Sequence, residues 1–166
     1  MIEFFDITVK FVCDRGVSHE LVRHRIASFA QESTRYVNYS KDNLGGDLHF
    51  IIPEWFKNEQ QEGLILTKQD LVAENNEELL WKIAMISAEE SYNTLIEKGW
   101  QPQQARSVLP NSLKTEINVK MNLREWRYFF KLRTAQAAHP QMKELTIPLL
   151  KELQTKIPII FDDINV

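Results

Sequence analysis

Two segments of the chain alternate between apolar and polar residues, in the manner of half-buried β-strands. The first runs from Ile7 to Cys13 and carries apolar side chains at every odd-numbered position. The second runs from Ser112 to Met121, where Leu, Thr, Ile, Val and Met alternate with Lys, Glu and Asn. A shorter apolar stretch, from Leu48 to Ile52, ends at a proline, and the Asn-, Asp-, Ser- and Gly-rich segment from Asn38 to Asp47 predicts a loop.

Helical spacing and capping residues predict five helices. They run from Ser18, as N-cap, to about Ser28; from Glu77 to Lys98, before Gly99; from Pro102 through Arg106; from Asn122, as N-cap, through Leu132; and from Pro140 to about Gln154. The second of these helices has an apolar row of Leu79, Ile83 and Ile86. The fourth has an apolar stripe of Trp126, Phe129, Phe130 and Leu132. With no repeat or linker along the chain, we expect one α+β domain over residues 1–166.

Composition narrows the class of protein. Apolar residues make up 43% and charged residues 26% of the chain, as in ordinary globular proteins, and no apolar run reaches the roughly 20 residues of a membrane span. The first ten residues lack the basic and apolar regions of a signal peptide, and a single cysteine forms no internal disulfide, so we expect a cytoplasmic protein. The net charge of −3 argues against a nucleic-acid partner.

Basic residues nevertheless gather in one region. Arg15, Arg23, Arg25 and Arg35 lie close together in an otherwise acidic chain, and Gln31 and Ser33 add an amide and a hydroxyl. Guanidinium forks bind phosphate oxygens in pairs, so this segment suits a small phosphorylated ligand. On the predicted helix, the consecutive residues 23–25 would point in three directions about 100° apart, so either part of this run is solvated or ligands or other subunits surround the helix end.

Other kinds of site find less support. His19 and His24 are five residues apart, not the four of a zinc-protease helix, and the remaining histidines offer no ligand spacing, so we expect no metal site. Cys13 lies on the apolar face of a predicted strand beside Asp14, which favours a core cysteine over a nucleophile. Ser33 has no evident histidine–carboxylate relay to activate it.

The order of these motifs resembles that of the flavin-dependent thymidylate synthases. Their Arg-His-Arg, seven residues, Ser pattern corresponds to residues 23–25 and Ser33. Residues 15–19 (RGVSH) precede it, residues 105–110 (ARSVLP) resemble the Arg-x-x-Leu-Pro segment, and residues 122–124 (NLR) with 132–133 (LR) resemble the Asn-x-Arg…Leu-Arg helix. The resemblance extends from about Ile2 to Leu150.

The resemblance implies a fold, a reaction and partners. The fold would be a central, mostly antiparallel sheet flanked by helices, in a homotetramer whose active sites are assembled from several subunits. The reaction would be the reductive methylation of dUMP to dTMP. Methylenetetrahydrofolate would supply the carbon, FAD reduced by NADPH would supply the hydride, and no protein nucleophile would be required.

Roles follow by position in the family pattern. The residues implied to bind FAD are Arg23, His24, Arg25, Gln31, Asn122, Arg124 and Tyr128. The residues implied to bind dUMP are Glu20, Arg23, Gln31, Ser33, Arg35, Arg106 and Arg133. Arg133 would also be catalytic, because a cation against the uracil ring stabilises negative charge that develops there.

The chain departs from the family pattern in several places. Family members are usually longer at the N-terminus, so we expect part of the family domain, including a segment that reaches FAD, to be missing. Glu20 stands where many members have Gln, Gln31 where Glu is usual, and Tyr128 where an Asn can occur. The alternatives are a catalytically impaired paralogue that binds FAD or nucleotide, a nucleic-acid-binding module and a scaffold protein.

Overall fold

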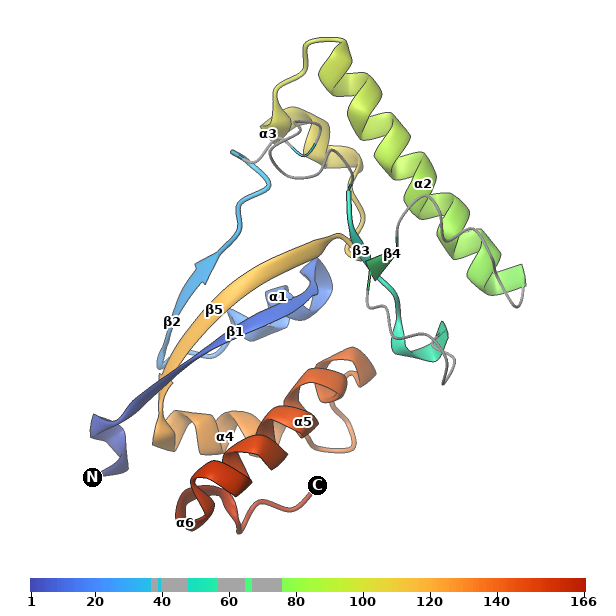
Figure 1. The fold of residues 1–166 in the computed structure, drawn as a ribbon. Helices are drawn as coiled ribbons and strands as arrows, with labels where there is room; N and C mark the ends of the chain where they lie inside the picture. Colours follow the sequence, from blue (N-terminus) through green and yellow to red (C-terminus); the bar gives the residue numbers. More distant parts are fainter. Residues whose placement is uncertain (37–38, 40–47, 57–64, 67–75) are drawn as a thin grey trace. The chain divides into compact units, whose positions relative to one another are not determined.

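The computed structural model describes residues 1–36, 39, 48–56, 65–66 and 76–166 (Figure 1). The loop predicted from Asn38 to Asp47 lies outside the described residues, apart from Tyr39. The chain divides into two compact units. Unit 1 comprises Met1–Phe11, Val17–Ala30 and Glu116–Val166, and unit 2 comprises Val12–Gly16 and Gln31–Thr115. The single domain expected over residues 1–166 stays a prediction.

A three-stranded sheet has most of its residues in unit 1. Its strands are β1 (Asp6–Asp14), β5 (Lys114–Asn122) and β2 (Ala27–Gln31), in the order β1-β5-β2, and a short 3₁₀ helix, η1 (Ile2–Phe4), precedes β1. The central strand β5 runs opposite to its two neighbours (Figure 1). Both strands predicted from alternation are confirmed, and in β5 the buried side chains recur at every second position, as predicted.

Helix α4 (Leu123–Arg133) follows β5 directly. Asn122 caps it as predicted, because its side-chain oxygen accepts a hydrogen bond from the backbone N–H of Glu125 at 2.8 Å. Trp126, Phe129 and Phe130 are completely buried. Leu132 is 46% exposed, so its place in the predicted apolar stripe is wrong: it lies beyond the edge of the buried face, about 60° around the helix from Phe129.

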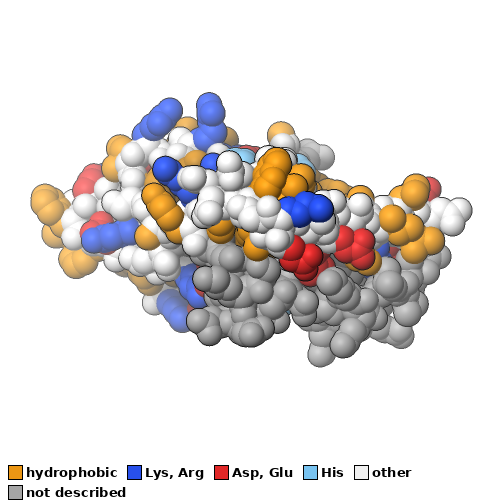
Figure 2. Space-filling model, turned by 90° about the horizontal axis from the view of Figure 1, so that it is seen from above, with side chains coloured by type: hydrophobic (Ala, Val, Ile, Leu, Met, Phe, Trp, Pro, Cys, Tyr) orange, Lys and Arg blue, Asp and Glu red, His pale blue; other side chains and the backbone are white. Residues whose placement is uncertain are grey.

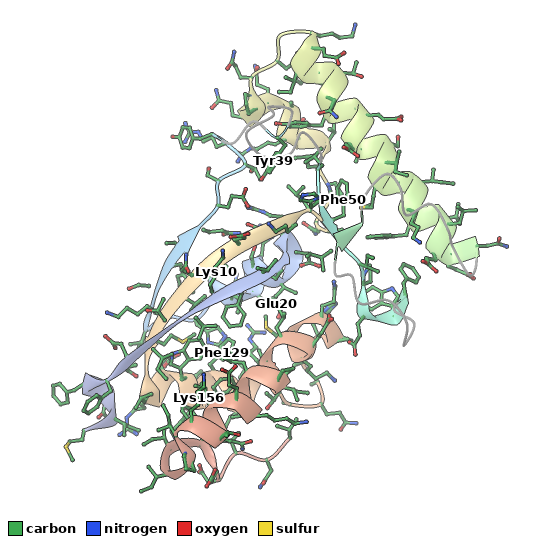
Figure 3. The ribbon with its side chains drawn as sticks, in the orientation of Figure 1. Lys10, Glu20, Tyr39, Phe50, Phe129 and Lys156 are labelled. Carbon is green, nitrogen blue, oxygen red and sulfur yellow. The ribbon has the colours of Figure 1, made fainter. Side chains whose placement is uncertain are left out.

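The aromatic side chains of α4 pack against the sheet and one another. Phe11 on β1 has ring centroids 6.4 Å from both Trp126 and Phe129, and the Trp126 indole N–H donates to the Ile7 carbonyl at 3.1 Å. Figure 3 shows Phe129 between β1 and the helices of unit 1. This cluster orients α4, and with it every polar residue that the helix carries.

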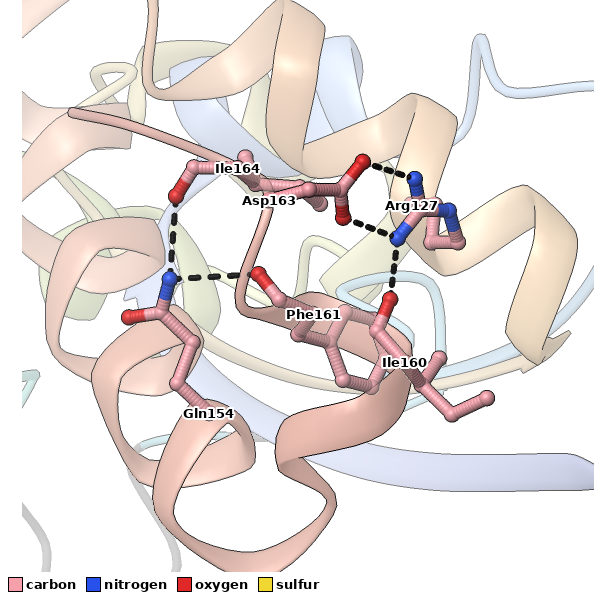
Figure 4. A network of polar contacts seen from close by, with 6 residues as sticks. All are labelled: Arg127, Gln154, Ile160, Phe161, Asp163 and Ile164. Atoms are coloured by element: carbon pink, nitrogen blue, oxygen red, sulfur yellow. Dashed lines mark hydrogen bonds and ion pairs between the residues drawn. The ribbon is translucent and has the colours of Figure 1, made fainter.

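Helices α5 (Pro140–Lys156) and α6 (Pro158–Phe161) complete unit 1. Hydrogen bonds from two side chains, Arg127 and Gln154, hold the end of α6 and the residues that follow it (Figure 4). Arg127 donates to both carboxylate oxygens of Asp163 at 2.5 Å, and Gln154 donates to the carbonyls of Phe161 and Ile164 at 3.2 and 2.9 Å. The predicted final helix is therefore confirmed, and its last turn is linked to the tail that follows.

Unit 2 contains the longest helix. Its elements are β3 (Phe50–Ile51), the 3₁₀ helix η3 (Glu54–Phe56), β4 (Ile65–Leu66), α2 (Asn76–Glu97), α3 (Pro102–Ala105) and the 3₁₀ helix η4 (Arg106–Val108). Strands β3 and β4 pair antiparallel. The helices predicted from Glu77 and from Pro102 are confirmed, and Gly99 adopts φ +89°, the left-handed conformation that ends helices.

The face that α2 buries is not its predicted apolar row. Leu79 and Ile83 are exposed, whereas Met85 and Tyr92 are buried together with a charged pair, Glu78 and Lys82, 2.7 Å apart. The core of this unit also contains Tyr39, whose ring meets Tyr92 edge-on, and Phe50, both labelled in Figure 3. Burying a charged pair while exposing leucine and isoleucine is unfavourable for a monomer.

The helix predicted from Ser18 to about Ser28 is wrong in extent. Helix α1 runs from Arg15 to Leu21, so Ser18 is a buried residue inside it rather than its N-cap. The chain leaves the helix at Val22, and Ala27–Gln31 forms β2. Pairing with β5 satisfies the backbone groups of these residues as a helix would, so this tertiary contact, rather than local propensity, selects the strand.

The chain combines helices with a small antiparallel sheet, so the α+β prediction is confirmed. Among the described residues, no helix has the length and apolar character to cross a membrane.

We expect Trp126→Ala to lower the free energy of unfolding by about 3–5 kcal/mol, because it leaves a cavity in the aromatic cluster and removes the bond to Ile7. Leu132→Ala, on the exposed side of the same helix, should change it by less than about 0.5 kcal/mol. Urea unfolding followed by circular dichroism measures both. Equal losses for the two variants would contradict the placement of α4.

Candidate functional site

Arg133, in the last turn of α4, meets two residues from the region of α1. Its Nη1 donates to the Glu20 carboxylate at 2.6 Å and its Nη2 to the Glu20 carbonyl at 3.2 Å. Its Nε donates to His24 Nε2 at 3.0 Å. Three predicted site residues, distant in sequence, thus form one hydrogen-bonded cluster in unit 1, and Figure 3 labels Glu20.

His24 is buried at the centre of this cluster. Its ring lies edge-on to Phe129, with centroids 4.9 Å apart, and its Nδ1 is 3.9 Å from Glu125 Oε1. Burial and, secondarily, the nearby positive charge of Arg133 lower the pKa of His24 to about 4. The imidazole is therefore neutral near pH 7.

Arg23 and Arg25 are exposed on either side of the buried His24. The run 23–25 lies beyond the end of α1, so the helical arrangement predicted for it is wrong. The backbone here turns from helix to strand, and this conformation directs the middle side chain inward and its neighbours outward. The two guanidinium groups are thus accessible to a ligand.

Other predicted residues of unit 1 lie around the start of α4. Asn122 caps the helix and also lines a hollow of about 320 Å³, together with Ile26, Ser28 and Lys120. Arg124 is exposed and forms an ion pair with Glu3, and Tyr128 is 58% exposed. Polar groups and an aromatic ring are therefore available at this end of the helix.

Unit 2 holds the remaining predicted residues. Arg106 donates to the Thr34 hydroxyl at 3.2 Å, and Arg35 donates through Nε to Gln103 Oε1 at 3.4 Å. The Ser33 hydroxyl accepts from the backbone N–H of Arg35 at 3.3 Å. Arg106 and Arg35 are both exposed, and these hydrogen bonds orient them. Because the partners Thr34 and Gln103 are neutral, they do not offset the positive charge of the two arginines.

Gln31 and Arg15 share a contact in the same unit. Gln31 Nε2 and Arg15 Nη1 lie 3.2 and 3.4 Å from the Thr115 hydroxyl, and Arg15 also donates to the Glu32 carbonyl at 3.3 Å. Arg15 thereby links the Thr115 hydroxyl to the backbone beside Gln31.

Three residues that contact the arginines and the histidine were not predicted from the sequence. Glu125 faces His24, while Thr34 and Gln103 orient Arg106 and Arg35. Glu125 follows the cap by three residues and Thr34 lies within the arginine-rich segment, so position along the chain was a usable signal for both. Gln103 gave no such signal. The ligand roles assigned to all of these segments stay predictions.

Cys13 is a core residue, as predicted. It is 2% exposed, and burial together with the negative charge of Asp14 raises the pKa of its thiol to about 12.

Within the described ranges, no three His, Cys, Asp or Glu side chains are grouped closely enough to hold a metal ion. On the face seen in Figure 2, the Lys and Arg side chains of the described residues are dispersed among other side chains.

Comparison with known proteins matches most of the chain. The family described as thymidylate synthase complementing protein matches residues 1–159. A flavin-dependent thymidylate synthase of Pyrococcus furiosus is 35% identical over 141 residues, which are 85% of this chain and 51% of that protein. The enzymes so named from Corynebacterium aurimucosum and Geobacter sulfurreducens are 36% and 32% identical, over 92% and 90% of this chain and 59% and 56% of their own. The chain thus spans about half the length of these relatives.

The lowered pKa of His24 predicts a dependence of stability on pH. Between about pH 6.5 and pH 4 the unfolded state takes up a proton on this residue and the folded state does not, so the free energy of unfolding falls as the pH falls. The loss attributable to His24 is on the order of 3 kcal/mol over this range and is absent above it. Urea unfolding at several pH values should show a shallower fall in His24→Asn, and parallel curves for both proteins would contradict this origin.

Burial of Cys13 predicts an unreactive thiol. At pH 8 the folded protein should react with Ellman's reagent at least about 100-fold more slowly than the urea-unfolded protein, because both access and thiolate formation are suppressed. Absorbance of the released chromophore measures the rate. Rapid labelling of the folded protein would show that this strand opens readily.

Proposed function

The chain belongs to the family of thymidylate synthase complementing proteins, and from this premise we propose that it is a flavin-dependent thymidylate synthase. The proposed reaction is the reductive methylation of dUMP to dTMP, a methyl transfer in which methylenetetrahydrofolate supplies the carbon and FAD, reduced by NADPH, supplies the hydride. The observation that carries the proposal is the cluster of Arg133, Glu20 and His24, which joins the two arginine-bearing motifs of the chain.

The described residues fit a flavin nucleotide. Arg23 and Arg25 offer exposed guanidinium groups that suit a diphosphate, and Tyr128 offers an exposed aromatic ring. The hollow beside Asn122 adds amide, hydroxyl and apolar groups. These residues, with Arg124 and Gln31, would hold FAD, which when bound supplies the hydride chemistry.

The proposed roles in substrate binding follow from charge. Arg35 and Arg106 would bind the dUMP phosphate beside Ser33, because their hydrogen-bond partners, Gln103 and Thr34, are neutral. Arg133 would lie against the uracil ring and stabilise the negative charge that develops on it. Because the resemblance implies active sites assembled from several subunits, these residues need not meet within one chain.

The exposed apolar face of α2 supports the proposed homotetramer. Leu79, Leu80 and Ile83 are 39%, 68% and 51% exposed on a helix that buries a charged pair. A second subunit over this face would remove the apolar surface from water. The cytoplasmic location expected from the sequence stays a prediction.

A catalytically impaired paralogue that binds FAD or nucleotide is the second candidate. One observation favours it: the Glu20 carboxylate already engages Arg133. Such a protein would bind the ligands without producing dTMP.

We expect purified protein to take up FAD and its visible absorbance band to shift when dUMP is added. Arg106→Ala should weaken dUMP binding by about 10- to 100-fold, because it removes a charge-assisted bond to phosphate. Lys156→Ala, which removes an exposed cation paired with Glu152 on α5, is the control and should leave binding unchanged.

Formation of dTMP from dUMP, methylenetetrahydrofolate and NADPH separates the two candidates. Turnover supports the synthase, binding of both ligands without turnover supports the paralogue, and a protein that takes up no FAD would overturn both.

A further inference from the structure

Arg133 is held on three sides. An arginine side chain carries five N–H groups and no acceptor. Its bonds to His24, to the Glu20 carboxylate and to the Glu20 carbonyl use three of them, which leaves one N–H on each terminal nitrogen. The side chain is 16% exposed, so its direction is set largely by these bonds.

The bond to Arg133 determines the proton arrangement of His24. Because Arg133 Nε can only donate, His24 Nε2 must accept and carries no hydrogen. The single proton of the neutral ring is then on Nδ1, the nitrogen that faces the Glu125 carboxylate at 3.9 Å. The ionisable groups around the ring are Glu125 and Arg133 on α4, with Glu20 on α1 beyond Arg133, and the Phe129 ring covers its edge.

We propose that His24 is a positioning residue: as the neutral Nδ1–H imidazole, it accepts from Arg133 and, with Glu20, sets the direction of the guanidinium group. Glu125 selects this form of the ring, because its carboxylate attracts the Nδ1 proton. The consequence for uracil binding rests on the proposed function, whereas the proton arrangement does not.

This role differs from the flavin contact that resemblance implies for His24. The imidazole is 3% exposed and its Nε2 is engaged by Arg133, whereas Arg23 and Arg25 on either side face outward. It also differs from that of a core histidine, which only fills space. A space-filling residue tolerates an apolar ring of similar size, whereas an acceptor does not, since its loss leaves the Arg133 Nε–H without a partner.

The proton arrangement is tested by NMR of protein labelled with ¹⁵N-histidine. The spectrum of His24→Asn identifies the His24 signals among those of the four histidines. At pH 7 we expect the Nδ1–H form, with Nε2 unprotonated. An Nε2–H form or a charged ring would overturn the inference, whatever the activity of the protein. Glu125→Gln, which removes the carboxylate charge, should shift the His24 nitrogens more than those of His19.

The positioning role is tested by two substitutions of His24. His24→Phe keeps a ring but removes the acceptor, and should weaken dUMP binding to the FAD-loaded protein about tenfold. His24→Asn retains a side-chain oxygen that can accept from Arg133, and should restore binding to within about threefold of the native protein. FAD affinity, measured by fluorescence, should be similar in both variants.

Each failure has its own signature. Loss of FAD affinity with dUMP affinity retained would assign His24 to the flavin and overturn the positioning role. Native dUMP affinity in His24→Phe would make His24 a space-filling residue and overturn the positioning role. If His24→Phe does not fold, the NMR form of the native protein and the dUMP affinity of His24→Asn decide the inference. A native protein with the expected Nδ1–H form but no dUMP binding would overturn the proposed function alone.

Discussion

The aromatic face of α4 is the interaction on which unit 1 depends. Trp126, Phe129 and Phe130 are completely buried, and Phe11 on β1 packs against the first two. Such side chains contribute several kcal/mol each through burial, far more than the polar contacts at the ends of the helix. They fix α4 in rotation, so that Glu125 and Arg133 emerge on the side that meets His24.

The polar cluster is stable because its charges are arranged to avoid an unpaired group. A partly buried guanidinium next to a charged imidazole would be costly, and the structure avoids this by keeping His24 neutral and pairing Arg133 with Glu20. Glu20 is one of the three positions at which the resemblance implies a departure from the family pattern, with Gln expected in its place. A carboxylate there holds Arg133 more strongly than an amide would, and partly neutralises the cation that the proposed function uses.

Local pattern succeeded in β1 and β5, where one face of each strand is buried against a neighbour. The alternation in β1 and β5 predicted their strands, because one side of each meets the core. Pattern failed from Val22 to Gln31, where the residues are compatible with either helix or strand and pairing with β5 decides. It also failed on the buried face of α2, because a charged pair inside and leucines outside invert the usual rule.

The sequence by itself determined the class of structure, the longest helix, both long strands and the segments that carry arginine, because each depends on residues near one another in the chain. It also carried the motif order that marks the family. Only the tertiary structure decided that His24 turns inward between two outward arginines, that Glu20 and Arg133 pair, and that Glu125 faces the imidazole. Those contacts join residues about a hundred positions apart, and their geometry is set by the packing of α4, which no local pattern contains.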